Sequence, residues 1–224
     1  MIKGGIKIYP QKNHNSFMKN VILLMFSQVI IKIVGLIYKL YLTNKEGFGD
    51  KGNAIFGSAF QIFSLFLTIS SAGVPNAIAK LVSSRSAIGD NKGAYRIFKI
   101  ALAIFGVCGF ICSSILFFGA DYIAKKYLLI PEAKYTIIAL APSVFLVAII
   151  SVIRGYFNGK ESINITANSQ SLEQIFKTVF TILFVEIISI ISIKNTTLMA
   201  GGAAIGASIA TFRKFNISIQ YFFI

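Results

Sequence analysis

Charged residues, and acidic ones above all, are scarce in this sequence of 224 residues. Only 13% of the residues are Asp, Glu, Lys or Arg, against roughly a quarter in soluble domains. The imbalance is large, with 8 acidic against 22 basic residues, and no acid lies between Phe17 and Leu42. Because 55% of the residues are hydrophobic and the mean hydropathy is +0.74, the composition excludes an ordinary soluble domain and predicts an all-α membrane protein.

Histidine and cysteine are too rare for a metal centre or a redox site. The single histidine, His14, lies in a polar N-terminal segment. Cys108 and Cys112 are four residues apart on one helical face, so we interpret them as small apolar packing residues. No nucleophile–base pair or phosphate-binding glycine loop is visible, and we therefore expect neither an enzyme nor a cofactor.

Six apolar runs are present, each close to the roughly 20 residues that cross a bilayer as a helix. They predict a six-helix transmembrane bundle over residues 17–212, preceded by a cytoplasmic tail at 1–16 and followed by a C-terminal tail at 213–224. The first run is too long for a signal-peptide core, so we expect it to remain as a helix. The runs are 17–42, 54–73, 97–119, 135–156, 171–193 and 197–212.

The distribution of lysine and arginine predicts the orientation. If the N-terminus is cytoplasmic, most basic loop residues, including Arg213 and Lys214, fall on the cytoplasmic side, as the positive-inside rule requires. Both termini are then cytoplasmic. The basic residues are spread over short loops and form no single basic face, so nucleic acid is not an expected partner.

Two lysines lie inside the first apolar run. Lys32 and Lys39 share a narrow arc of that helix with Gln28, Gly35 and Thr43. A cation at the centre of a membrane helix costs about 2.5–3.5 kcal/mol, and such residues usually face a watery cavity and act on what passes through it. We expect Lys32, Lys39 and Gln28 to line a cavity, although the Lys39 side chain can alternatively extend to the membrane interface.

Polar stripes also follow the later helices. In the fifth run Glu173 and Lys177 have the i,i+4 order that favours an ion pair, and in the fourth run Arg154 aligns with Ser143. Packing between helices is the alternative interpretation of such stripes, because polar side chains often bond across membrane helices. Pro75 predicts a kink or helix end near residues 72–75.

Four passages resemble the multidrug/oligosaccharidyl-lipid/polysaccharide flippase superfamily, and most closely its stage V sporulation protein B and MurJ-like polysaccharide biosynthesis branch. The fourth passage contains an Arg-Gly-Tyr-Phe-x-Gly run and a Ser-x-x-x-Glu-Gln run, which are typical of that branch. The similarity covers roughly residues 17–210. The passages are IIKIVGLIYKLYL (30–42), SSAGVPNAIAKLVS (70–83), GDNKGAYRIFKIAL (89–102) and VIRGYFNGKESINITANSQSLEQIFKTVF (152–180).

The resemblance implies a flippase of the bacterial plasma membrane that turns over a lipid-linked oligosaccharide or peptidoglycan precursor through a central cationic cavity. Lys32 stands where members of the branch place a cavity arginine. Lysine keeps the charge but loses the bidentate fork that suits a pyrophosphate. The candidate substrate-binding residues are Lys32, Lys39, Gln28, Arg154, Glu173 and Lys177.

The chain also departs from the family, whose members have two lobes of spanning helices with the cavity between them. It is similar to the N-terminal lobe only, and after Ala210 it no longer follows the expected continuation, so we expect a truncated member. Alternating access needs two bundles that move against each other, so a working protein requires a second lobe, from another copy or a separate chain. The alternatives are a cation or drug antiporter, which would place an acid in the first helix, and a non-transporting fragment.

Overall fold

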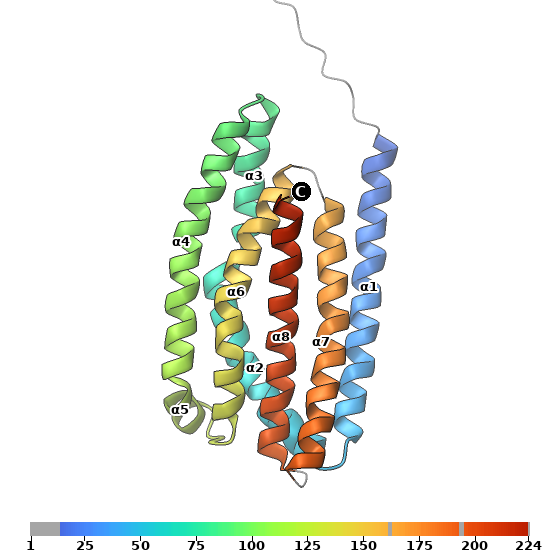
Figure 1. The fold of residues 1–224 in the computed structure, drawn as a ribbon, viewed down its shortest axis with the longest axis vertical. Helices are drawn as coiled ribbons and strands as arrows, with labels where there is room; N and C mark the ends of the chain where they lie inside the picture. The colour runs from blue at the N-terminus through green and yellow to red at the C-terminus, as the bar shows by residue number, and fades with distance from the viewer. Residues whose placement is uncertain (1–13, 161–162, 193–194, 224) are drawn as a thin grey trace, which may run out of the picture.

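The computed structural model describes residues 14–160, 163–192 and 195–223, all of which belong to helices or the short turns between them (Figure 1). The long helices run up and down along the longest axis of the molecule. They are α1 (His14–Asn44), α2 (Gly49–Ser71), α4 (Asn91–Phe118), α6 (Ala133–Gly159), α7 (Ile163–Ile191) and α8 (Thr196–Phe223). Shorter segments connect them, namely α3 (Val74–Ala87), α5 (Ala120–Tyr122) and the π-helical turn η1 (Ile123–Tyr127).

Four helical segments of the described chain are both long and apolar enough to cross a membrane. They are Gly49–Ala87, Asn91–Phe118, Ala133–Gly159 and Leu172–Ile191. The all-helical class is therefore confirmed. Six membrane spans were expected, but only these four described segments are long and apolar enough to count as spans. In α8 the reason is a sequence rich in glycine and alanine that also carries Arg213 and Lys214.

The predicted break near residues 72–75 is confirmed. Helix α2 ends at Ser71, and α3 begins at Val74 with Pro75 in its first turn. Gly73 between them has φ +75°, a left-handed conformation that glycine adopts without a steric penalty. The chain therefore changes direction here before α3 packs against α4 and α6.

The last helix extends beyond residue 212, where the expected membrane span ends. Helix α8 continues to Phe223, because lysine and arginine are good helix formers even where the apolar run stops. Lys214, expected at the cytoplasmic surface, is only 3% exposed. One face of this end of the helix, with Lys214 and Ser218, is therefore packed inside the bundle, whereas Arg213 and Asn216 are exposed.

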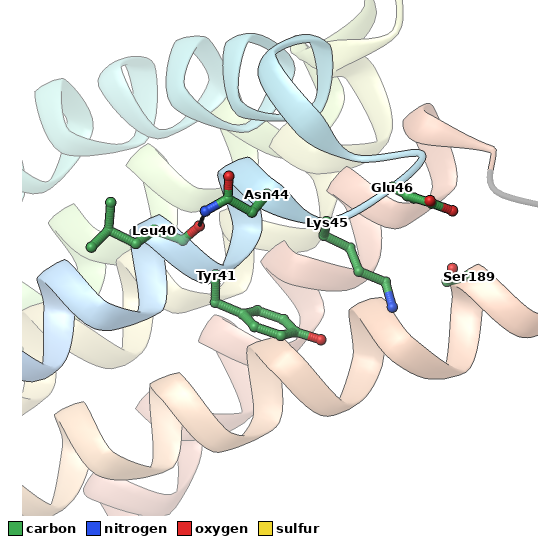
Figure 2. A pocket seen from close by; sticks show the side chains of 6 residues that line it. All are labelled: Leu40, Tyr41, Asn44, Lys45, Glu46 and Ser189. Atoms are coloured by element: carbon green, nitrogen blue, oxygen red, sulfur yellow. Dashed lines mark hydrogen bonds between the residues drawn. The ribbon is translucent and has the colours of Figure 1, made fainter.

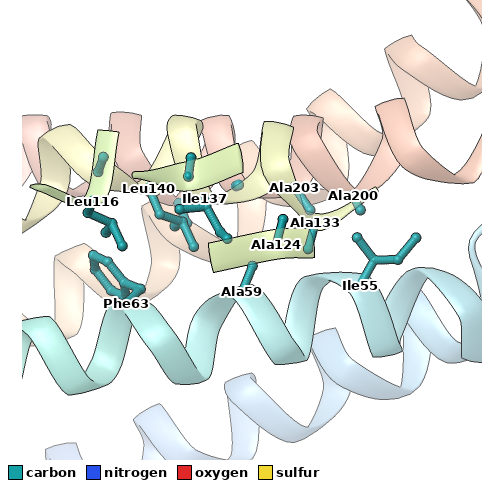
Figure 3. Packing of buried hydrophobic residues seen from close by; sticks show 14 of the residues in the cluster. Ile55, Ala59, Phe63, Leu116, Ala124, Ala133, Ile137, Leu140, Ala200 and Ala203 are labelled. Carbon is teal, nitrogen blue, oxygen red and sulfur yellow. The ribbon is translucent and has the colours of Figure 1, made fainter. Parts of the chain in front are cut away.

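Helix α6 is the centre of the packing, with α2, α3, α4 and α8 against it. One apolar cluster joins α2, α6 and α8, and Figure 3 shows its side chains facing one another, among them Phe63, Leu140 and Ala203. Glycine lets α7 and α8 approach closely, since a β-carbon added at Gly206 would lie 2.6 Å from the backbone nitrogen of Thr181. Such close contacts are the main source of helix association in lipid.

A second, smaller apolar cluster lies beyond the break at Gly73. It combines Val74, Ile78 and Val82 of α3 with Phe98 of α4 and Val152 of α6. The described ends of α1 and α8 are both at this end of the bundle (Figure 1). Between the start of α1 and the end of α8 the chain therefore runs along the bundle an even number of times.

Candidate functional site

A cavity of about 250 Å³ lies among α2, α6, α7 and α8. Four charged side chains line it, and they are Arg154 of α6, Glu173 and Lys177 of α7, and Lys214 of α8. Three cations thus accompany a single carboxylate. Apolar side chains complete the wall, among them Phe60.

Three of the four charged residues were predicted from the helical faces, and the structure brings these three together. The predicted ion pair was wrong, because Glu173 accepts from the Lys214 ammonium of α8. The Lys177 ammonium instead lies over the ring of Phe60, 4.7 Å from its centroid. This cation–π geometry stabilises an ammonium that has little contact with water.

Lys214 is the residue that sequence reasoning missed. Its position was assigned to a tail because the apolar run stops at residue 212. The signal was nevertheless present, since Ala207, Thr211 and Lys214 follow a helical spacing and all three line the cavity. Periodicity alone, followed beyond the apolar run, would have found it.

Lys39 lines a second pocket, of about 320 Å³, between α1, α2 and α7. This pocket shares Phe60 and Lys177 with the first cavity. Asn53 and Tyr38 also line it, and among the described residues the buried Tyr38 hydroxyl has no hydrogen-bond partner. The structure therefore links Lys39 of α1 to the charged interior through Lys177.

Lys32 and Gln28 are not brought into this cluster. Lys32 is exposed on α1 and lines neither of the two pockets, and the Gln28 side chain lies outside the described residues. Gly35, between Lys32 and Lys39 on the same stripe, lies against α7, since a β-carbon there would be 3.5 Å from the Gln174 side-chain nitrogen. The middle of the polar stripe on α1 therefore lies at the contact between α1 and α7. The role of Lys32 stays a prediction.

A third polar group joins α1 to α7 at the opposite end of the bundle from the described termini. The Lys45 ammonium lies 2.6 Å from both carboxylate oxygens of Glu186, and the Tyr41 hydroxyl donates to the same carboxylate. Figure 2 shows Tyr41 and Lys45 extending toward the helix that carries Ser189, at a pocket of about 510 Å³. Glu186 therefore ties two helices together near the expected interface.

These features define the class of the protein, a multi-pass helical membrane protein with a charged interior cavity. A family model described as "Polysaccharide biosynthesis protein" matches residues 17–224. The chain belongs to this family, as the resemblance of its four passages predicted. The match continues past Ala210, where the similarity was expected to stop.

Three relatives from Bacillus subtilis (strain 168) are similar to the chain. Stage V sporulation protein B is 30% identical over 212 residues, which cover 93% of this chain and 39% of that protein. Lipid II flippase MurJ is 28% identical over 206 residues, covering 88% of this chain and 36% of the relative. The uncharacterized membrane protein YabM is 27% identical over 163 residues, 69% of this chain and 28% of the relative.

The chain thus spans less than two fifths of the length of these relatives, and in the first two it matches the N-terminal part. This agrees with the expected similarity to an N-terminal lobe. No solved structure matches the chain at comparable stringency.

Proposed function

We propose that this chain forms one lobe of a flippase that moves a lipid-linked oligosaccharide or peptidoglycan precursor across the bacterial plasma membrane. The observation that carries the proposal is the excess of cations in the cavity, three against one carboxylate. Family membership supports it, as does similarity to a relative named as a lipid II flippase.

The physical problem that such a protein solves is the hydration of a pyrophosphate. Transfer of a charged group into an apolar medium is prohibitive unless other charges or donors replace its water. The Arg154 guanidinium supplies a planar fork of donors, and the lysines supply point charges. Lys39 receives the pyrophosphate in the pocket between α1, α2 and α7, and Lys177 connects this pocket to the deeper cavity.

The membrane arrangement belongs to the same proposal. The six long helices each cross the bilayer, with α3 extending the crossing of α2, and both termini of the chain lie in the cytoplasm. A second lobe, from a continuation of the chain, another copy or a separate chain, completes the central cavity, because alternating access needs two bundles that rock against each other. Lys32, which is exposed on α1, faces that second lobe, and Gln28 is expected on the same stripe from its position in the sequence.

An antiporter for cations or drugs is the competing function within the superfamily. Glu173 supplies a carboxylate in the cavity, but Lys214 already occupies it. Arg154 and Lys177 line the same cavity and repel a cationic ligand. The electrostatics therefore favour an anionic ligand.

Binding tests the proposal without requiring a second lobe. The purified protein in lipid nanodiscs is titrated with a polyprenyl-diphosphate sugar, and Lys39→Met and Lys177→Met are compared with the unaltered chain. Because a hydrogen bond to a charged group contributes about 1.5–3 kcal/mol, each variant should weaken binding by about tenfold or more. Lys80→Met, at an exposed position of α3, is the matched control and should bind normally.

Two results would reject the proposal. One is the absence of saturable binding by the unaltered protein. The other is equal affinity in the unaltered protein and in both cavity variants. A non-transporting lobe would then be the better description.

A further inference from the structure

The charges of the cavity are not balanced by the protein. Lys214 takes the carboxylate of Glu173. Among the described residues neither Lys177 nor Arg154 forms an ion pair. Arg154 is close to the end of α6 at Gly159, whereas Lys177 lies near the middle of α7. A buried cation without an anionic partner is costly, and the Phe60 ring supplies no full negative charge, so Lys177 is a charge that needs a counter-ion.

A hydroxyl group in the cavity also lacks a binding partner, and this observation is independent of the charges. Ser143 of α6 is 1% exposed and lines the cavity. Its hydroxyl has no hydrogen-bond partner among the described residues, although buried polar groups are almost always satisfied. By contrast, the hydroxyl of Thr211, which lines the same cavity, donates to the Ala207 carbonyl at 3.1 Å.

We infer that this cavity binds a small inorganic anion of the chloride class, held by the ammonium of Lys177 and the hydroxyl of Ser143. A monovalent anion neutralises Lys177, and the hydroxyl supplies an O–H donor to it. The cavity volume of about 250 Å³ leaves room for the ion together with water. The site lies within one lobe and does not depend on whether the chain binds a lipid-linked saccharide.

Equilibrium binding of radioactive chloride to the detergent-purified chain tests the inference. A single saturable class of sites is expected, displaced by bromide and not by gluconate, which is too large. Lys177→Met and Ser143→Ala should each weaken chloride binding by about tenfold, the value of one hydrogen bond to an ion. The exposed Lys80→Met is the control and should bind chloride as the unaltered chain does.

Thermal unfolding gives a second measurement. Replacing gluconate by chloride at constant sodium concentration should raise the midpoint by about 5 °C once chloride exceeds its dissociation constant about a hundredfold. Ser143→Ala removes only one atom and keeps the charges, so it should fold and should lose most of this shift. It serves as the decisive variant if Lys177→Met does not fold.

The inference is overturned if the unaltered chain shows no saturable chloride binding, or if the binding is the same in Ser143→Ala and Lys177→Met. Equal unfolding midpoints in chloride and gluconate would also overturn it. A failure here is distinguishable from a failure of the proposed flippase function, because polyprenyl-diphosphate binding is measured separately and Lys39→Met affects only that assay.

Discussion

Glu173 of α7 and Lys214 of α8 are ion-paired inside the bundle although 41 residues separate them in the sequence. The lysine side chain is only 4% exposed and the carboxylate 25% exposed. The pair therefore fixes the relative position of two helices that also pack closely through Gly206. Removing one partner leaves a charge in the interior without compensation.

We predict that Glu173→Gln lowers the free energy of unfolding by about 3 kcal/mol, because three cations then share a cavity with no carboxylate. The double variant Glu173→Gln with Lys214→Met should recover part of this loss, since it removes the stranded ammonium as well. Thermal unfolding in detergent measures both. A double variant less stable than Glu173→Gln alone would contradict the assigned pairing.

The contact between α7 and α8 should be intolerant of a larger residue at its closest point. Gly206→Ala would place a β-carbon 2.6 Å from the Thr181 nitrogen and 2.7 Å from the Phe180 carbonyl group. Because backbone atoms cannot move aside, we expect a loss of about 1–3 kcal/mol in unfolding free energy.

Gly57→Ala is the matched control for this substitution. No atom lies within 4 Å of an added β-carbon at Gly57, and Gly57 is likewise in the interior of a helix. Alanine should therefore stabilise α2 by up to about 1 kcal/mol. The same sign of change at both positions, measured by unfolding, would argue against the close approach of α7 and α8.

The bond between Glu186 and Lys45 should contribute much less than the interior pair. Its side chains are 36% and 23% exposed respectively, and ion pairs near solvent contribute roughly 0–1 kcal/mol. We predict that Glu186→Gln changes stability by less than about 1 kcal/mol and that added salt reduces the difference. An effect as large as that of Glu173→Gln would show that this end of the bundle is drier than its exposure indicates.

Cysteine labelling tests the proposed orientation. In a background with both natural cysteines replaced by alanine, Asp50→Cys lies at the start of α2 and Lys92→Cys at the start of α4, at opposite ends of the bundle. A membrane-impermeant maleimide should label Asp50→Cys in intact cells and Lys92→Cys only after permeabilisation. The reverse pattern would place both chain termini outside the cytoplasm.

Much of the fold was predictable from the sequence because apolar runs mark helices in lipid directly. The break at Gly73 and Pro75 followed from local chemistry, and the faces carrying Arg154 and Glu173 followed from helical periodicity. What could not be predicted was lateral packing, which decides the partner of Glu173. An i,i+4 rule considers one helix at a time, so it chose Lys177 where the neighbouring helix supplies Lys214.

The conformation of Gly73 has a wider consequence. It lies at the boundary between two separate apolar clusters, one built on α2 and the other on α3. Helices α4 and α6 run through both clusters, and glycines of α6 hold α3 close, since a β-carbon added at Gly155 would lie 2.9 Å from the Pro75 carbonyl oxygen. The left-handed turn at Gly73 therefore lets one membrane pass supply side chains to two separate cores that share the same supporting helices.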